Sequence, residues 1–341
     1  MRNRILTYSC LFIISLAFAG CKLVHEFPED PPVNPYLVDI SIDIDIDMQI
    51  SSDTIFQTYA SMLAGDYDVR YIVDIYNADE SRTDGLGSRV QRIVKTESNI
   101  ISNGIYHIKD TVKLTIKKYR LIAWMDFVEK GSVTDKYYNT DDLQRISILP
   151  QSGGYQGYNT TKDAFTAKTN MDLTPYSGQR FIQYQAVLSV KRPFAIYQII
   201  TTDIKEYITY HQTLSYASIQ PSSTTLAYNL FFPLGYNAYL NAPDNLQGGV
   251  RYSYDIVEII PEQEAVIASD FVFVEDNAFL LVDFEVFSAE NAHINTIYGL
   301  RINLERNKLT IIRAEFLTKD MDDGHVGIED GFDDDEIIVN I

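Results

Sequence analysis

The sequence predicts an all-β protein made of two tandem β-sandwich domains with short helices. Residues 38–51 alternate apolar and polar side chains without interruption, which is the period of a half-buried strand. Further runs of β-branched and aromatic residues follow, bounded by Asn, Asp, Gly and Ser, and long helical periodicity is scarce. The 24 tyrosines and 17 phenylalanines suit half-buried strands. A chain of 341 residues is long enough to form two cores.

The N-terminus has the pattern of a bacterial lipoprotein signal. Arg2 and Arg4 form a short positive region, residues 5–18 form an apolar region, and the sequence LAFAGC ends on Cys21. The apolar run is shorter than the roughly 20 residues that a membrane-spanning helix needs. We therefore predict that residues 1–20 are removed and that Cys21 carries a lipid. An ordinary secretory signal followed by a chance cysteine is the alternative interpretation.

Charge and cysteine content limit the partners of the mature chain. Cleavage before Cys21 leaves 26 Lys and Arg against 47 Asp and Glu, a net charge of −21. Such a chain repels nucleic acid and anionic lipid surfaces, so we expect the lipid on Cys21 to attach it to the outer membrane. Because Cys10 lies in the signal, the folded part has no thiol. This excludes disulfides, cysteine nucleophiles and thiolate metal sites there.

A tether and a regular strand follow the signal. Residues 21–37 are rich in proline and acidic residues, which favour an extended spacer. Residues 38–51 read VDISIDIDIDMQIS, with aspartates on the face opposite the apolar side chains. Same-face neighbours on a strand lie roughly 6.6 Å apart, whereas calcium takes about six to eight oxygens at about 2.4 Å, so one strand does not complete a calcium site. We expect a solvated face that discourages edge-to-edge aggregation.

We predict an N-terminal domain over residues 38–177 and a C-terminal domain over residues 178–341. The boundary falls at the turn-forming sequence PYSG that ends at Gly178. One helix is expected at residues 54–63, and a short one after Asp203, which would act as its N-cap. The remaining strands are predicted at residues 69–76, 90–96, 111–117, 119–128, 143–149, 164–173, 181–190, 195–202, 251–260, 264–275, 279–288, 298–304, 309–316 and 336–341.

The sequence contains no pattern that indicates catalysis or a cofactor. The five histidines are scattered singly, and GxSxG, P-loop and dinucleotide-binding motifs are absent. The glycine-rich stretch at 152–159 is interpreted as a turn, and the 47 acidic residues make any pair of carboxylates uninformative. We therefore predict no catalytic residue, no cofactor and no metal site, and expect that the protein is not an enzyme.

Two further features have both a structural and a functional interpretation. The acidic segment at residues 320–336 partly resembles an EF-hand loop but lacks its alternating spacing and closing glutamate. A solvated loop is therefore favoured over calcium binding. Trp124 is the single tryptophan and lies between apolar neighbours in YRLIAWMDFV. It is expected in the core rather than on a sugar-stacking surface.

Five segments of the chain carry a family resemblance. They read YRLIAWMDFV at 119–128, DKYYNTDDLQRISI at 135–148, TTKDAFTA at 160–167, VLSVKRPFAIYQIITTD at 187–203 and RNKLTIIRAEFLT at 306–318. In this order they resemble the fimbrillin and fimbrial-anchor lipoproteins of Bacteroides-type bacteria. The resemblance implies two transthyretin-like β-sandwich domains and a role in type V pili as a stalk, anchor or tip subunit, or as a surface adhesin. Partner subunits would join by strand addition, with residues 38–50 and 336–341 as candidate joining strands.

The distribution of basic residues discriminates between these roles. Stalk subunits of that family resemble one another in being cut by an arginine-specific protease. Here no lysine or arginine lies between Lys22 and Arg70, and Arg70 lies in a predicted strand, where folded backbone is a poor substrate. The loop at 79–87 also carries an arginine, Arg82.

We therefore expect the chain to keep its lipid and to act as a surface-exposed fimbrial anchor or accessory subunit, with a host or glycan ligand left open. The alternative is a glycan-binding surface lipoprotein of a polysaccharide-uptake system.

Overall fold

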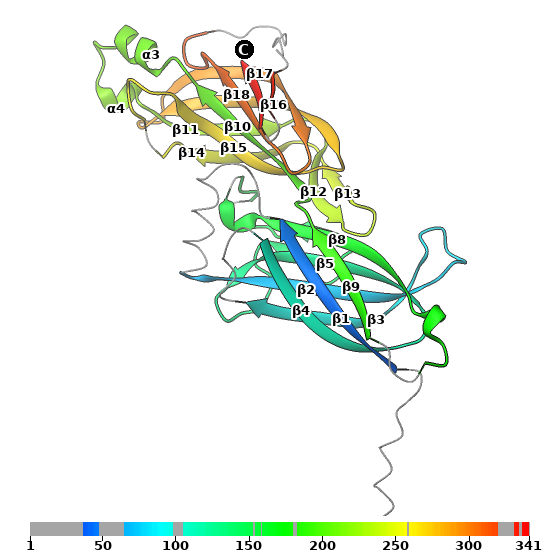
Figure 1. Ribbon diagram of the computed structural model, residues 1–341. Coiled ribbons are helices and arrows are strands. Elements are labelled where there is room, and N and C mark those ends of the chain that lie inside the picture. The colour runs from blue at the N-terminus through cyan, green and yellow to red at the C-terminus, as the bar shows by residue number, and fades with distance from the viewer. Residues whose placement is uncertain are drawn as a thin grey trace, which may run out of the picture.

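The computed structural model describes residues 37–47, 65–97, 105–152, 154–157, 159–179, 183–257, 259–319, 331–333 and 336–340. Strands dominate these residues and form two β-sandwiches arranged end to end (Figure 1). The predicted all-β class with two tandem sandwiches is therefore confirmed. The helix predicted at residues 54–63 lies outside the described residues.

The first sandwich packs a three-stranded sheet, in the order β4-β1-β9, against a four-stranded sheet, in the order β3-β2-β5-β8. Apolar side chains from both sheets fill the space between them and form one buried core. The strands are β1 (Leu37–Asp47), β2 (Tyr67–Ala78), β3 (Leu86–Glu97), β4 (Ile105–Thr115), β5 (Lys118–Glu129), β8 (Ala164–Asp172) and β9 (Gln183–Val190), and a 3-10 turn, η2 (Thr174–Tyr176), joins the last two.

The strand β9 belongs to the first sandwich, although it follows the boundary predicted at residues 177 and 178. It runs parallel to β1, and Ala186, Leu188 and Val190 are buried in the first core. The first sandwich therefore does not end at the predicted boundary. Side-chain alternation identified β9 as a strand but did not show which sheet it would join.

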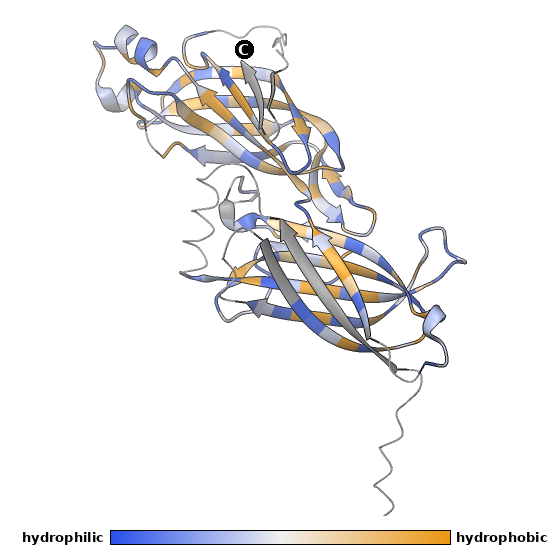
Figure 2. Cartoon of the chain, in the orientation of Figure 1, coloured by the Kyte–Doolittle hydropathy of each residue, from blue (hydrophilic) through white to orange (hydrophobic). Residues whose placement is uncertain are grey.

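The second sandwich packs a five-stranded sheet, in the order β15-β10-β18-β20-β19, against a four-stranded sheet, in the order β14-β11-β16-β17. Hydrophobic and hydrophilic residues alternate along many of these strands (Figure 2). The elements are β10 (Phe194–Thr201), α3 (Ile204–Tyr210), α4 (Tyr216–Ile219), β11 (Pro221–Tyr228), β14 (Val250–Asp255), β15 (Ala265–Phe273), β16 (Asn277–Ser288), β17 (His293–Glu305), β18 (Leu309–Ala314), β19 (Gly331–Asp333) and β20 (Glu336–Asn340).

A small composite sheet joins the two sandwiches. It has the order β13-β12-β7-β6, so strands from both halves of the chain share one set of hydrogen bonds. A separate buried apolar cluster surrounds it, with Trp124 and Tyr138 from the N-terminal half and Phe194 and Phe273 from the C-terminal half. The elements are β6 (Tyr138–Asn139), β7 (Ile146–Ile148), η1 (Thr160–Lys162), β12 (Phe232–Asn237) and β13 (Ala242–Gln247).

Two local predictions need correction. Residues 221–247 form three strands that were not predicted, because Pro233, Gly235 and Pro243 interrupt the usual strand pattern. A helix does begin after Asp203, but the Asp203 side chain makes no capping hydrogen bond. Its carboxylate instead accepts hydrogen bonds from the backbone of Leu317 and Thr318, and so holds the end of β18.

Candidate interaction surfaces

The predicted lipid-bearing residue, Cys21, lies outside the described residues, as do the signal and residues 21–36 of the tether. The acidic segment at residues 320–330 lies outside them too. The described chain begins at Leu37, the first residue of β1, near the lower end of the molecule in Figure 1. A tether that precedes Leu37 therefore joins the first sandwich at the end far from α3 and α4.

The two candidate joining strands occupy different positions. The strand β1 lies in the middle of its sheet, antiparallel to β4 and parallel to β9, so both of its edges are hydrogen-bonded. The strand β20 lies near the end of its sheet, where it pairs parallel with β18 and antiparallel with the three-residue β19. The side chains of β18 are largely buried, so β20 covers the edge of a core strand.

Arg70 is buried on the face of the β3-β2-β5-β8 sheet that points away from the first core, because its neighbours Val69 and Tyr71 on β2 point into that core. It lies on β2, and its guanidinium donates to both carboxylate oxygens of Asp126, at 2.9 and 2.6 Å, and to Asp135 Oδ1 at 2.7 Å. Only 2% of Arg70 is exposed. Because a protease must bind its target arginine in an extended, accessible segment, the backbone at Arg70 is closed to cleavage in the folded protein.

The nearest accessible arginine is Arg82, in the tight turn between β2 and β3. Its side chain is more than half exposed and pairs with Asp84 at 2.8 Å. The turn is closed by backbone hydrogen bonds between Asp79 and Gly85 and between Gly85 and Arg82. A cut here falls after β2 has entered the sheet between β3 and β5, so the strands on both sides of the cut remain paired.

A loop of the N-terminal half inserts into the core of the second sandwich. The Tyr155 hydroxyl donates to Asp270 Oδ2 at 2.9 Å, and the Tyr228 hydroxyl donates to the same oxygen at 2.7 Å. Burial raises the pKa of Asp270 to about 7, although the charge of Lys162 and both hydroxyls act in the opposite direction. The loop and the second sandwich therefore share a buried polar centre.

A second buried contact lies where the chain passes between the sandwiches. Arg192 Nε donates to Asp163 Oδ2 at 2.7 Å, and both side chains are fully buried. The Arg192 guanidinium also lies 4.7 Å from the centre of the Phe165 ring. Taken with the composite sheet, these contacts resist rotation of one sandwich against the other.

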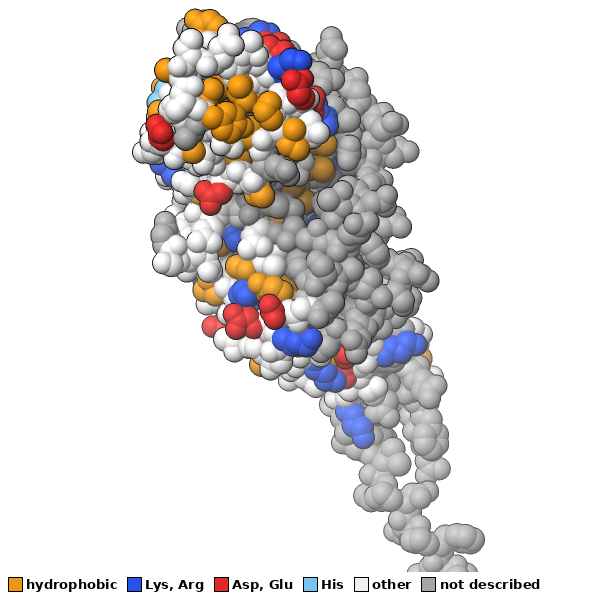
Figure 3. Space-filling view, turned by 90° about the vertical axis from the view of Figure 1, so that its left-hand side faces the viewer, with side chains coloured by type: hydrophobic (Ala, Val, Ile, Leu, Met, Phe, Trp, Pro, Cys, Tyr) orange, Lys and Arg blue, Asp and Glu red, His pale blue; other side chains and the backbone are white. Residues whose placement is uncertain are grey.

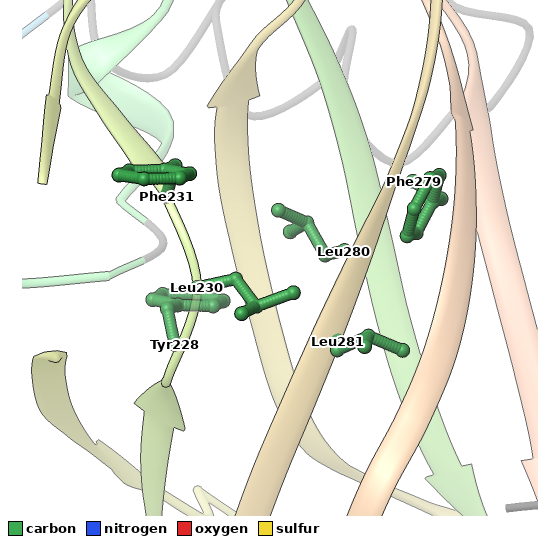
Figure 4. A pocket seen from close by; sticks show the side chains of 6 residues that line it. All are labelled: Tyr228, Leu230, Phe231, Phe279, Leu280 and Leu281. Carbon is green, nitrogen blue, oxygen red and sulfur yellow. The ribbon is translucent and has the colours of Figure 1, made fainter. Parts of the chain in front are cut away.

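The largest solvent-exposed apolar side chains include those around a small hollow beside the composite sheet. The connection between β11 and β12 supplies Leu230 and Phe231 on one side of the hollow. The strand β16 supplies Phe279 and Leu281 on the other side (Figure 4). The hollow has a volume of about 180 Å³, and the Arg301 guanidinium lies 4.3 Å from the Phe279 ring centre. Exposed apolar surface of this kind is typical of contact sites.

Other predicted features can be placed directly. Trp124 is fully buried, packs edge-on against Tyr138 at 5.4 Å and donates to Asp126, so its prediction as a core residue is confirmed. Across the residues that the structure describes, no three His, Cys, Asp or Glu side chains are grouped so that they could hold a metal ion. Nor does that part of the chain contain a helix long and apolar enough to cross a membrane.

The fold thus defines a two-sandwich, all-β protein with a rigid joint and exposed strand and apolar surfaces. The chain belongs to the family of unknown function DUF6562, whose sequence profile matches residues 33–340. No curated protein matches it.

Several solved structures resemble this one. The fimbrial anchor protein Mfa2 of Porphyromonas gingivalis is 8% identical, with a TM-score of 0.43, and the match covers 76% of this chain and 82% of Mfa2. The tip fimbrial protein Mfa3 of the same organism is 9% identical, with a TM-score of 0.37 and coverage of 78% and 80%. A Bacteroides thetaiotaomicron protein, provisionally described as polysaccharide binding, is 12% identical, with a TM-score of 0.45 and coverage of 76% and 80%.

Proposed function

We propose that this protein is a lipid-anchored fimbrial anchor or accessory subunit of the cell surface, without catalytic activity. The observation that carries the proposal is the burial of Arg70. It is the first lysine or arginine after Lys22, and its buried guanidinium is held by Asp126 and Asp135. An arginine-specific protease therefore has no accessible site between the lipid and the folded body. The mature chain keeps its attachment to the outer membrane.

The joint between the sandwiches supports an anchoring role. A subunit that connects a filament to a membrane transmits force through its whole length. The composite sheet, the Arg192–Asp163 pair and the insertion of Tyr155 give this chain two sandwiches that move as one body. A flexible linker would instead let the domains swing apart, as weakly packed domain pairs do.

The strand β20 is the better candidate for joining another subunit. It covers the edge of β18, and its exchange for a strand of a neighbour would re-form the same parallel pairing. Both strands are paired on two edges, but β20 pairs at five positions with β18 and three with β19, whereas β1 pairs at eleven positions with β4 and eight with β9. Assembly through β20 therefore requires the smaller rearrangement.

The anchoring part of the proposal is tested by Cys21→Ala in the native host. The wild type should incorporate radiolabelled palmitate and sediment with outer membranes, whereas the variant should be unlabelled and soluble after export. Equal circular dichroism spectra of the two proteins would show that folding is unchanged. A variant that stays in the outer membrane without label would contradict the proposal.

The assembly part is tested by deleting residues 336–341. Pilus subunits that co-purify with the wild type from detergent-solubilised membranes should be lost from the truncated protein, while its melting temperature should fall only slightly. Deletion of the residues before Arg70 would not serve as a control, because it would remove the strand β1 from the first sandwich. Replacing Glu336 by glutamine keeps the strand and should leave co-purification intact, and unchanged co-purification by the truncated protein would refute the role of β20.

A further inference from the structure

The helices α3 and α4 and the turn between them form the end of the second sandwich that lies farthest from Leu37 (Figure 1). We call residues 204–219 the distal tip. Since a tether at Leu37 holds the opposite end of the molecule, the distal tip is the part of the protein that extends away from the membrane under the anchoring proposed above.

The distal tip has an unusual composition. Residues 209–218 read TYHQTLSYAS and contain no Asp, Glu, Lys or Arg, in a chain of which 22% of residues are charged. Its large side chains face solvent, with Tyr210 82% exposed, Leu214 55% and Tyr216 46%. In Figure 3, which faces this side, the upper sandwich shows mostly uncharged and hydrophobic side chains, with charged ones near its margins.

The exposed tyrosines are held in place by buried neighbours. Ile204, Tyr207 and Ile219 lie in the core of the second sandwich and fix both ends of the distal tip. The centre of the His211 ring lies 4.8 Å from that of Tyr207, at a tilt, and 4.9 Å from that of Tyr210, edge-on, so three aromatic rings form one cluster from core to surface. Pre-ordering of this kind lowers the entropy that a surface loses on binding.

The second end of the tip is also ordered. The Ser215 side chain accepts a hydrogen bond from the Ser218 backbone and so caps α4, and Gln220 bonds back to Tyr216. Lys205 at the start of α3 is paired with Glu262 on the neighbouring loop at 2.7 Å, which leaves its charge compensated. The tip therefore presents aromatic faces, hydroxyls and amides to solvent. Residues 209–218 contribute no Asp, Glu, Lys or Arg to this surface.

We propose that the distal tip binds a neutral glycan. Tyrosine supplies a rigid amphipathic face, suited to the apolar face of a sugar ring, and a hydroxyl that forms hydrogen bonds. The neighbouring Thr, Ser and Gln side chains match the hydroxyl groups of a sugar. An acidic polysaccharide would find no lysine or arginine in residues 209–218 and would be repelled by a mature chain of net charge −21. The inference rests on the anchoring proposed above, which turns the distal tip away from the membrane, and it adds a ligand class to that role.

The test uses the purified full chain in detergent. Immobilised neutral polysaccharides, such as glucan, mannan and xylan, are compared with acidic ones, such as polygalacturonate and heparin. At least one neutral polysaccharide should retain the protein. The double variant Tyr210→Ser and Tyr216→Ser should bind that polysaccharide at least about tenfold more weakly than the wild type does. The matched control is Tyr298→Ser, because Tyr298 is also a largely exposed tyrosine but lies on β17. It should bind like the wild type.

Three results would overturn the inference. The first is binding of the wild type to acidic polysaccharides alone. The second is an equal loss of glycan binding in the control variant Tyr298→Ser. The third is a wild type that binds no glycan and a double variant that loses its pilus subunits, which would make the tip a protein contact. The glycan-binding measurements use purified protein. A Cys21→Ala protein that stays in the membrane would therefore refute the anchoring proposal without changing the result at the tip.

Discussion

The two sandwiches each bury a carboxylate, but they surround it differently. In the first sandwich, Asp126 is clamped by the guanidinium of Arg70 and by the indole N–H of Trp124. In the second, Asp270 accepts hydrogen bonds from the hydroxyls of Tyr155 and Tyr228. The first carboxylate is hydrogen-bonded by a cation. The second is hydrogen-bonded by neutral hydroxyls, and the charge of Lys162 also acts on it.

This difference predicts different sensitivities. Burial raises the pKa of both carboxyl groups, and at Asp126 the hydrogen bonds and charge of Arg70 oppose that rise. A charge pair fails when one partner is removed, because the remaining charge stays buried. A carboxylate held by hydroxyls responds instead to pH, because protonation removes the charge without disrupting the packing. The first sandwich should therefore depend on Arg70, and the second on pH.

The largest effect is expected from Arg70→Met. The substitution keeps most of the volume but leaves Asp126 without its cation, which should lower the free energy of unfolding by about 3 to 5 kcal/mol. Denaturant unfolding at pH 7 measures it. Arg82→Met, in the exposed turn, is the matched control and should change stability by less than about 0.5 kcal/mol. Equal, small effects at both positions would show that the buried pair is not a stabilising centre.

The pH dependence of Asp270→Asn sharpens the comparison. The folded pKa of about 7 lies above the ordinary value of 3.8, so the folded protein holds a proton that the unfolded chain releases between these pH values. The wild type should therefore lose up to about 4 kcal/mol of stability, relative to the variant, as pH rises from 4 to 7, and no more above that. Melting temperatures of both proteins at pH 5 and pH 8 measure this, and parallel pH curves would contradict it.

Tyr155→Phe isolates one hydroxyl of the second centre. It removes the hydrogen bond from the inserted loop to Asp270, and a bond to a charged group contributes about 1.5 to 3 kcal/mol. The loss should be larger at pH 8, where Asp270 is ionised, than at pH 5. Tyr298→Phe, on the exposed face of β17, should be neutral at both pH values. A loss that does not change with pH would mean that Tyr155 acts through packing alone.

The smallest loss of stability is expected where the same loop packs against Tyr252. A Cβ at Gly157 would lie 2.0 Å from the Tyr252 ring, so Gly157→Ala forces the loop outward and should cost about 1 to 3 kcal/mol. At Gly248, the nearest atom to an added Cβ is 3.7 Å away, and Gly248→Ala should be tolerated. Calorimetric melting of the two variants distinguishes a steric requirement at Gly157 from a general need for flexible turns.

Local pattern predicted much of the fold. The alternation at residues 38–51 predicted β1 through its period of two. The terminal sequence EIIVN predicted β20 through its β-branched residues. Trp124 was placed in the core from its apolar neighbours alone. Residues 221–247 were missed because their strands contain proline and glycine, and because β11 and β12 pair with the distant strands β16 and β7.

The candidate surfaces were less accessible to such reasoning. The tyrosines around Asp270 are spread over residues 155–252, so nothing in the sequence brings them together before the sheets form. The aromatic cluster of the distal tip comes from neighbouring residues of the chain. The uncharged run at residues 209–218, with its two tyrosines, is a sequence signal that could have indicated it. Its exposure depended on which side of α3 faced the core.

The sequence by itself determined the strand class, the acidic charge, the absence of thiols in the folded part and the signal pattern that ends on Cys21, because each depends on residue type and short-range order. Only the tertiary structure decided that β9 completes the first sandwich, that Arg70 is enclosed and that Tyr155 crosses into the second core. Pairing between strands is set by contacts among residues far apart in the chain, and those contacts exist only once both sheets have packed.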